Sequence, residues 1–257
     1  MRIALILMNK IYYIYILILL ITFSCSKKSE NKTIELKILS KEIISHKNLD
    51  SMRYSNKDFR KNQNKAVFRF KISNKTNQNY CLVLRNVLNT YNGINTIEGA
   101  NLDLDFLQII NKNSKDTIKV HYAYTLPMLN KKELELYEKN NKILMQQYNN
   151  LNYSKSLFWM EKNQQITNNM VCLKSNEVKY FETFVNLPYN VSSDNANYVE
   201  LNFSDNYNAF LKFISDTTNI KKYLTWSQLK NIKENNYKLF HGTITSENSV
   251  PVVFVDK

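Results

Sequence analysis

The sequence predicts a mainly β domain, with an antiparallel, sandwich-like arrangement of sheets that two helices interrupt. Three observations support this fold class. Apolar and polar residues alternate with a period of two in many short segments, as they do in strands with one buried face. Asn, Ser and Asp separate these segments in a chain with only three Gly and three Pro, and Asn is well suited to turns. Finally, 17 Tyr and 13 Phe supply large side chains for a core.

The predicted strands follow a short polar segment. Residues 34–38 alternate strictly between apolar and polar, and so do residues 68–72. The same alternation predicts strands over 102–106 and 118–124. Further strands are predicted over 79–88, 168–173, 177–187, 198–203, 208–215, 237–245 and 250–255.

One pair of predicted strands has a turn signal between them. Ser73 to Asn77 separates two apolar runs, so the segment from Val67 to Leu84 is predicted to be a β-hairpin. This segment resembles a hairpin of an immunoglobulin-like sandwich. The resemblance is generic, and it implies no functional residue.

A helical insertion is predicted near residues 130–151. Asn130 can cap its N-terminus, and Glu133 stands three residues later, as a capping box requires. The wider region 128–165 is predicted to be either an insertion between two halves of the sheet or a seam between two domains. An apolar face follows the cap at helical spacing and consists of Leu134, Tyr137, Leu144, Tyr148 and Leu151.

A second, short helix is predicted near residues 226–235. Thr225 is the expected N-cap, and Gln228 stands three residues later. Trp226, Leu229 and Ile232 then share one face of this helix.

The N-terminus has the pattern of an export signal. Arg2 and Lys10 precede an apolar run that begins at Ile11, and a cysteine, Cys25, follows Ser24 at its end. This arrangement resembles the signal peptide of bacterial lipoproteins. In that family the cysteine thiol receives a diacylglycerol, the chain is cut just before the cysteine, and the new amine is acylated. The resemblance therefore implies a lipidated Cys25 as the first residue of the mature protein.

The lipoprotein resemblance implies a division of the chain into three parts. Residues 1–24 are the signal peptide, residues 25–33 are the lipidated cysteine and a polar tether, and residues 34–257 are the globular domain. The protein is then a lipid-anchored membrane protein of the bacterial cell envelope that faces the periplasm or the cell surface. A cleaved plain signal and an uncleaved anchor are the alternatives, and translation starts at either Met1 or Met8.

The formal net charge is +13, and much of the excess lies in one segment. Residues 47–75 contain nine Lys or Arg against only Asp50 and Asp58. Such a segment is attracted to anionic surfaces, although a solvated loop is the simpler interpretation. Nucleic acid is not expected as a partner, because an exported and tethered protein rarely meets it. The residues predicted to contact an anionic surface are Arg53, Lys57, Arg60, Lys61 and Lys65.

Two cysteines remain if Cys25 is lipidated. Cys81 and Cys172 both lie in apolar, strand-like runs. In an oxidising compartment an even pair can form a disulfide, and two separately buried thiols are the alternative. No Cys/His spacing typical of a metal site is present, so neither a metal nor another cofactor is expected.

No catalytic set is evident in the sequence, and no catalytic residue is assigned. Asp103 and Asp105 are two residues apart and so share one face of the predicted strand, where a solvent-facing role is the simpler interpretation. His121 is expected on the polar face of its strand. Phe158 and Trp159 follow the first predicted helix among polar residues and are candidates for an exposed patch.

These observations favour a non-catalytic, lipid-anchored envelope protein that binds an unknown protein or glycan partner through its surface. One alternative is a tethered hydrolase of cell-wall or glycan material with Asp103, Asp105 or His121 in its site. Another is a module that binds anionic membranes through the basic segment. A concave cleft that gathers carboxylates or histidines from different strands would favour the enzyme, whereas an exposed patch at Trp159 would favour binding.

Overall fold

A computed structural model describes residues 33–46, 66–84, 88–89, 101–102, 104–123, 131–185, 187–191 and 196–255. Among these residues, no helix combines the length and the apolar character needed to cross a membrane. Several predicted features lie outside the described residues: the signal segment 1–24, Cys25, Asp103, and the basic residues Arg53, Lys57, Arg60, Lys61 and Lys65.

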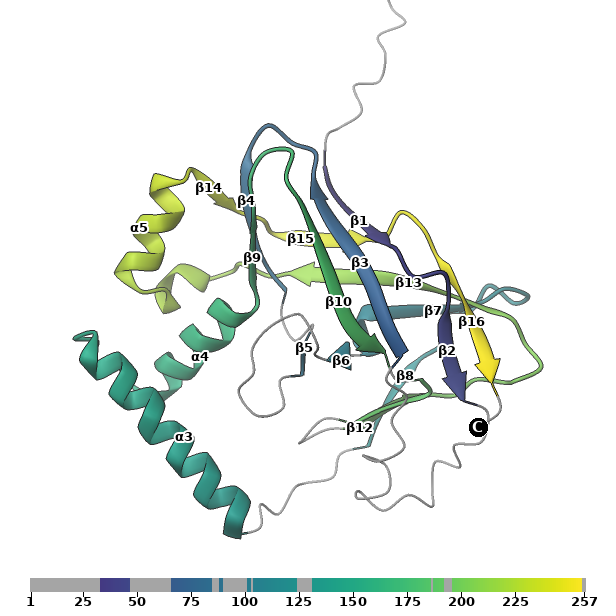
Figure 1. Cartoon of the computed structure of the whole chain (residues 1–257), viewed down its shortest axis with the longest axis horizontal. Coiled ribbons are helices and arrows are strands. Elements are labelled where there is room, and N and C mark those ends of the chain that lie inside the picture. The colour runs from purple at the N-terminus through teal and green to yellow at the C-terminus, as the bar shows by residue number, and fades with distance from the viewer. Residues whose placement is uncertain are drawn as a thin grey trace, which may run out of the picture. The chain divides into compact units, whose positions relative to one another are not determined.

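The predicted fold class is confirmed: strands predominate and form a sandwich-like pair of layers within residues 34–257 (Figure 1). The first layer is built on antiparallel pairing of β3 with its two neighbours, and β6 joins β10 in parallel at Phe184. Its strand order is β1 (Ile34–Ile38), β3 (Ala66–Asn74), β10 (Val178–Val185), β6 (Asn101–Leu102) and β5 (Leu88–Asn89).

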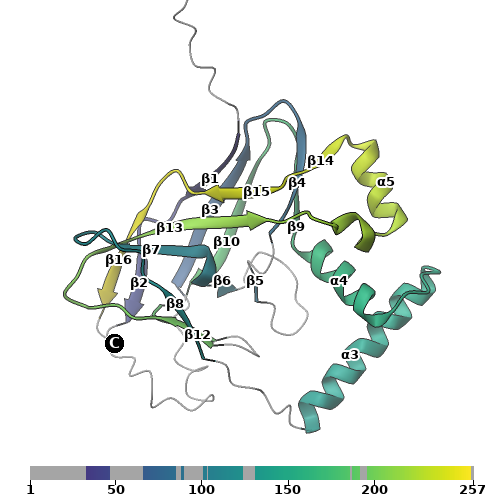
Figure 2. The same ribbon diagram turned by 180° about the vertical axis from the view of Figure 1, so that it is seen from behind.

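The second layer, which faces the viewer in Figure 2, is built around β13 (Tyr207–Ser215). Three strands pair with β13 in antiparallel fashion, β7, β15 and β16, and β2 pairs in parallel with β16. These strands are β7 (Leu107–Asn111), β15 (Gly242–Thr245), β16 (Val250–Val255) and β2 (Ile43–His46).

Two smaller sheets complete the described strands. One has the order β14 (Tyr237–Leu239), β4 (Asn79–Val83) and β9 (Met170–Leu173). The other has the order β11 (Tyr189–Val191), β12 (Ala196–Val199) and β8 (Val120–Ala123).

The main core lies between the two layers, as the alternation of the strands predicts. Phe70 of β3 meets Phe213 of β13 edge to face, with ring centroids 5.3 Å apart, and Phe181 of β10 stacks on Phe70 at 5.0 Å. Both Phe70 and Phe213 are fully buried. Arg69, the residue before Phe70 in β3, points outward and pairs with Glu182. Burial of such large rings is the main stabilising contribution to the sandwich.

The predicted hairpin over 67–84 is wrong, because β3 and β4 belong to different sheets. β3 pairs with β1 and β10, whereas β4 pairs with β9 and β14. The turn between β9 and β10 likewise connects two different sheets. Two chain reversals therefore lie against each other where the sheets meet. We call residues 73–79 and 173–177, which form these reversals, the arch corner.

Asn74 explains why the chain turns away from hairpin pairing at the arch corner. Its buried side-chain amide donates to the carbonyl oxygens of Gln78 at 2.7 Å and Lys174 at 2.9 Å, and its Oδ1 accepts from the Thr76 amide at 3.0 Å. The backbone N–H of Asn74 donates to the carbonyl of Glu177. One side chain therefore replaces the ladder hydrogen bonds that a hairpin would provide.

A disulfide joins the two reversals a few residues further on. Cys81 of β4 and Cys172 of β9 are directly paired in the antiparallel register, and the structure bonds their sulfur atoms. Cys81 is completely buried. The bond links two strands that are 91 residues apart in sequence.

The predicted strand over 102–106 is wrong: residues Leu104–Phe106 form one turn of 3-10 helix, η1. Leu104 and Phe106 are buried and Asp105 is exposed, so the alternation is real, but pairing with β13 starts only at Leu107. Such a short alternating run does not distinguish a strand from a 3-10 turn whose apolar residues enter the core. The strand that follows, β7, was not predicted.

Three helices are described: α3 (Lys131–Asn150), α4 (Leu157–Asn168) and α5 (Trp226–Glu234). Both predicted helices are confirmed in extent, and α4 is an addition. Ser156 begins α4, since its side chain accepts a hydrogen bond from the Trp159 amide. In Figures 1 and 2 the three helices lie together, next to the sheet of β14, β4 and β9, and α5 contacts β14.

The predicted apolar faces of α3 and α5 are buried only in part. Leu144 and Tyr148 of α3 pack on Met160 of α4. Leu134, Tyr137 and Leu151 are exposed, although the Tyr137 hydroxyl donates to Glu161 of α4 at 3.4 Å. On α5, Leu229 and Ile232 pack inward, but Trp226 is 68% exposed because its ring projects beyond the first turn.

Candidate functional site

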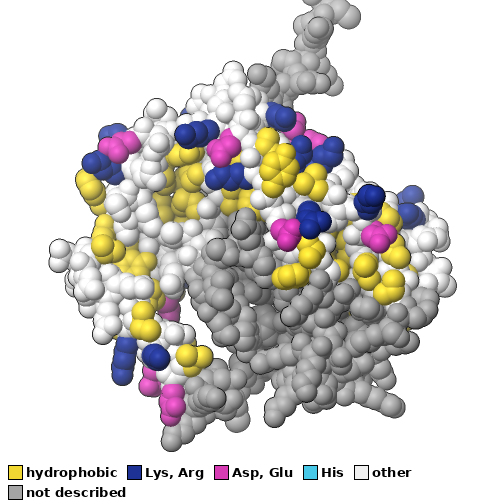
Figure 3. All heavy atoms as spheres, in the orientation of Figure 1, with side chains coloured by type: hydrophobic (Ala, Val, Ile, Leu, Met, Phe, Trp, Pro, Cys, Tyr) yellow, Lys and Arg dark blue, Asp and Glu magenta, His cyan; other side chains and the backbone are white. Residues whose placement is uncertain are grey.

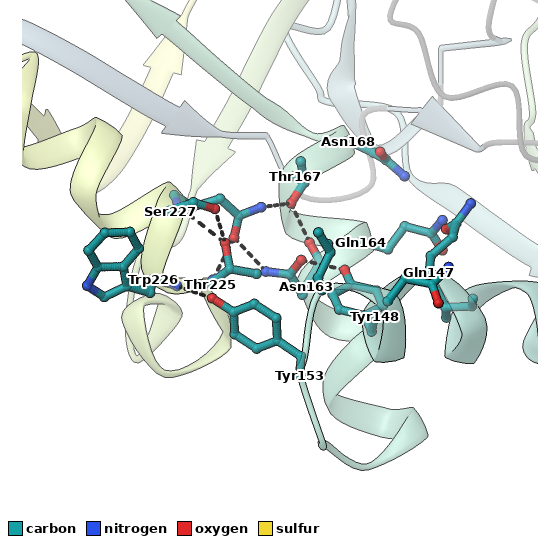
Figure 4. Close-up of a pocket in the computed structure, with 14 residues that line it drawn as sticks. Gln147, Tyr148, Tyr153, Asn163, Gln164, Thr167, Asn168, Thr225, Trp226 and Ser227 are labelled. Atoms are coloured by element: carbon teal, nitrogen blue, oxygen red, sulfur yellow. Dashed lines mark hydrogen bonds between the residues drawn. The ribbon is translucent and has the colours of Figure 1, made fainter.

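A groove of about 850 Å³ lies between α3, α4 and the start of α5 (Figure 4). We call it the α3–α5 groove. Its lining is uncharged: among the described residues that form it, none is Asp, Glu, Lys, Arg or His. Apart from Leu144 and Leu151, the lining side chains are the amides of Gln147, Asn150, Asn163, Gln164, Asn168 and Gln228, the hydroxyls of Thr167, Thr225 and Ser227, and the rings of Tyr148, Tyr153 and Trp226.

The capping box at Thr225 positions the α5 wall of the groove. The Thr225 hydroxyl accepts from the Gln228 amide N–H at 3.2 Å, and the Gln228 side chain accepts from the Thr225 N–H at 2.7 Å. This reciprocal pair fixes Gln228 toward α4 and starts the helix so that Trp226 is its first residue.

Asn163 forms the floor of the groove and joins three segments of the chain. It is 2% exposed, and its Oδ1 accepts a hydrogen bond from the Tyr148 hydroxyl of α3. Its amide donates to Gln228 Oε1 at 2.7 Å and to the carbonyl of Tyr223. Burial raises the pKa of Tyr148 above its usual value of 10.0, so the hydroxyl stays protonated and continues to donate at neutral pH.

A second set of bonds closes the floor between α4 and α5. Gln228 Nε2 donates to the Thr167 hydroxyl at 2.8 Å, and that hydroxyl donates to the Asn163 carbonyl at 2.7 Å. The polar side chains of the floor therefore hydrogen-bond to one another, and these bonds hold α4 and α5 in one fixed arrangement.

Aromatic residues form one end of the groove. Tyr153 stacks on Trp159 with ring centroids 5.9 Å apart, and its hydroxyl accepts from the Trp226 backbone N–H at 2.7 Å. Figure 4 shows the Trp226 ring at this end, beyond Tyr153. The Lys230 ammonium lies 5.0 Å from the centre of that ring and 3.7 Å from Glu234, so its charge is locally balanced.

The other end of the groove carries unused hydrogen-bonding groups. Within the described part of the chain, the side-chain amides of Gln147, Asn150, Gln164 and Asn168 have no hydrogen-bond partner. Each amide offers two N–H donors and one carbonyl acceptor. The groove thus combines a satisfied, rigid floor with an unsatisfied wall.

The predicted patch at Phe158 and Trp159 divides into two different environments. Phe158 is 57% exposed and has Lys162 above its ring at 5.7 Å. Trp159 is only partly exposed, because it packs on Tyr148 and Tyr153 and donates its indole N–H to the Lys222 carbonyl at 2.8 Å. Trp159 therefore supports the aromatic end of the groove, and the exposed indole is that of Trp226.

Asp105 and His121, the two described residues that were considered for hydrolysis, do not form one site. Asp105 is exposed and accepts a hydrogen bond from the Tyr122 hydroxyl. His121 precedes Tyr122 on β8, so its side chain leaves the opposite face of the strand, where it stacks on Tyr198. The described residues also contain no group of three or more His, Cys, Asp or Glu arranged to hold a metal ion.

A second groove, of about 650 Å³, lies beside the start of β13 and does gather carboxylates. Asp116 follows β7, whereas Glu200 and Asp205 both lie in the connection between β12 and β13, and all three line the groove. Asp205 accepts from the side-chain amide of Asn111 at 3.0 Å. Burial, and to a smaller extent the nearby Asp205 carboxylate, raises the pKa of Tyr207 above its usual 10.0.

Sequence reasoning missed the α3–α5 groove, although a signal for it was present. Asn and Gln are frequent over residues 146–168, so many uncharged hydrogen-bonding side chains come from this one region. The groove could not be assembled without knowing that α4 is a helix and that α5 returns to it. In comparisons with known proteins, no family model, no curated protein and no solved structure matches this chain.

Proposed function

We propose that this chain is a non-catalytic binding protein, held at the bacterial cell envelope by lipid on Cys25, and that it binds its envelope partner in the α3–α5 groove. The N-terminal pattern ending at Cys25 supports the anchor. The observation that carries the binding role is the uncharged groove, with a rigid hydrogen-bonded floor and amides free on its wall. A concave site with a few convergent polar groups is the usual form of a ligand site.

The charge distribution supports the groove rather than the sheet surface as the binding site. On the face visible in Figure 3, Lys and Arg are interspersed with Asp and Glu over the described strands, without a large field of one sign. Charged side chains on the strands also form pairs, such as Arg69 with Glu182 at 2.7 Å and Lys75 with Glu35 at 3.9 Å. Such exposed pairs are typical of a solvated surface.

The anchor is tested by the intact mass of the protein extracted from its native membrane. A chain that starts at an acylated Cys25 is expected. A mass that keeps the residues before Cys25 and has no acyl chain would reject the anchor.

The binding role is tested by co-sedimentation of the purified full chain with envelope fragments from cells that lack it. Saturable binding is expected, and Trp226→Ala should weaken it by about tenfold. Tyr180 is a matched control, because it is 66% exposed on β10 and away from the groove, so Tyr180→Ala should bind normally. Absence of saturable binding, or equal loss in both variants, would reject the binding role.

The second groove favours one alternative function, a tethered hydrolase of envelope glycan. Most glycosidases use a pair of carboxylates that flank the scissile bond, and Asp116, Glu200 and Asp205 line one groove. The alternative predicts that the protein releases reducing ends from envelope glycan, and that Asp205→Asn or Glu200→Gln abolishes this release. We expect no release from either the native protein or the variants.

A further inference from the structure

We infer that the α3–α5 groove binds a neutral oligosaccharide, whose sugar ring packs on Trp226 while its hydroxyls bond the free amides of α3 and α4. This inference rests on the proposed binding function and names the ligand class of the same site. It is carried by three features of the groove: the absence of charge, the unused amides, and the exposed aromatic ring at one end.

The first feature is that the described lining contains no ionised side chain. An anionic ligand would lose its hydration in the groove without gaining a counter-charge, and the same holds for a cationic ligand. The Lys230 ammonium, which lies over the Trp226 ring, is balanced by Glu234 at 3.7 Å. The groove therefore selects for an uncharged ligand.

The second feature is the chemistry of the free amides. Gln147 lies on α3, and Gln164 and Asn168 lie on α4, so their side chains project from two walls into one space (Figure 4). Every sugar hydroxyl both donates and accepts a hydrogen bond, and a carboxamide does the same. An amide wall consequently matches a surface of hydroxyls without any change of protonation state.

The third feature is the position of Trp226. Its ring is the largest exposed aromatic surface at the groove, with 68% of the residue exposed. The C–H face of a sugar ring is apolar and flat enough to cover an indole, and this contact adds affinity to the hydrogen bonds. Because Trp226 lies at one end in Figure 4 and the amides of Gln147, Gln164 and Asn168 lie at the other, we expect a ligand of more than one sugar.

A peptide fits the same groove less well. Strand addition needs an open sheet edge, but the walls of the groove are helices whose backbone groups are already bonded. A bound amphipathic helix needs an apolar groove, and Leu144 and Leu151 are the only aliphatic residues of the described lining. The observations therefore favour a glycan over a peptide.

The test uses the same co-sedimentation with envelope fragments after two separate treatments. One sample is digested with protease, and the other is oxidised with periodate and reduced with borohydride, which destroys vicinal diols. Binding of the full chain is expected to survive protease and to be lost after periodate. The affinity for the fragments should also depend little on the salt concentration, because no ion pair forms with the ligand.

Variants on one helix separate the groove from a general surface effect. Gln147→Ala should weaken binding roughly three- to tenfold, because one or two hydrogen bonds to the ligand are lost. Gln146→Ala is the matched control, since Gln146 is the same residue type, is exposed on α3 and does not line the groove. Both variants should unfold at the same temperature as the native protein.

The outcomes distinguish this inference from the proposed function. If untreated fragments bind and Trp226→Ala weakens binding, but protease abolishes binding and periodate does not, the partner is a protein; the groove still binds and the glycan inference is overturned. If binding resists both treatments, or if Gln146→Ala and Gln147→Ala behave alike, the glycan inference is also overturned. If no fragments bind at all, the proposed function itself fails.

Discussion

The arch corner and the α3–α5 groove use the same kind of side chain in opposite ways. At the arch corner Asn74 is fully buried, and its amide bonds backbone carbonyls and the Thr76 amide. At the groove Asn163 is bonded in the same way, but Gln147 on the wall above it has no partner among the described residues. Satisfied amides fix a fold, whereas accessible and unsatisfied amides are available to a ligand.

The largest effect is expected at the arch corner. Asn74→Ala should lower the free energy of unfolding by about 4 kcal/mol, because several buried carbonyl and N–H groups lose their partner at once. Urea unfolding measures the change. Gln78→Ala is the control in the same turn, since the Gln78 side chain is exposed, and it should change stability by less than about 0.5 kcal/mol. Equal effects of the two variants would contradict this account of the corner.

The second effect concerns the disulfide beside the corner. Replacing both Cys81 and Cys172 by Ala should cost about 3 kcal/mol of stability, because the bond closes a long loop of the unfolded chain. Urea unfolding of the double variant, with the native protein as reference, measures the change. An unreduced native mass that does not increase by two hydrogens on reduction would show that the bond is absent.

The third effect lies in the floor of the groove. Asn163→Ala should lower the free energy of unfolding by about 2 kcal/mol, because the Tyr148 hydroxyl and the Tyr223 carbonyl then lose a buried partner. Thermal unfolding measures it, and neighbouring Gln164→Ala is the control, expected within about 0.5 kcal/mol of the native protein. If Gln164→Ala proved the more harmful change, the distinction between floor and wall would be wrong.

A fourth effect appears only at high pH. Burial raises the pKa of Tyr148 in the folded protein. The contribution of its protonated hydroxyl to the free energy of unfolding is therefore complete below about pH 10 and is lost as the pH rises further. Stability measured from pH 8 to pH 11 should therefore fall less steeply in Tyr148→Phe than in the native protein. Parallel curves would mean that the hydroxyl titrates normally.

The smallest effect on stability is expected on the wall of the groove. Gln147→Ala should leave the free energy of unfolding within about 0.5 kcal/mol of the native value, because its amide has no partner to lose. Urea unfolding checks this, with Gln146→Ala alongside. A loss above about 1 kcal/mol would show that Gln147 supports the fold and is not free for a ligand.

The sequence was sufficient for the fold class and for elements with strong local signals. Phe68, Phe70 and Ile72 alternate and are all buried in β3, and Thr225 with Gln228 forms the predicted capping box of α5. In these elements burial and capping depend on residues only a few positions apart. Local spacing is then a reliable guide.

The arch corner could not be predicted, because its turn residues are also those of a hairpin. Ser73 to Asn77 contains the polar residues that both structures use. What decides between them is the bond from Asn74 to Lys174, a contact between residues 100 positions apart. Helix α4 was missed for a similar reason, since its buried residues Met160, Asn163 and Ile166 include an amide that only the tertiary structure explains.

The groove itself also depends on contacts between residues that are far apart in the sequence. Gln147, Asn163 and Trp226 belong to three helices, and no local pattern joins them. Of the predicted patch, Phe158 is exposed but Trp159 is only partly exposed, and the more exposed indole is that of Trp226.

The two tryptophans also offer the most direct test of the groove as a glycan site. The chain has only Trp159 and Trp226, so its spectrum should contain two indole N–H resonances, one from the bonded Trp159 and one from the exposed Trp226. Titration with protease-treated, solubilised envelope glycan should shift the Trp226 indole and the Gln147 side-chain amide, and leave the Gln146 amide unchanged. Shifts confined to the sheets, or no shift at either groove residue, would contradict the account.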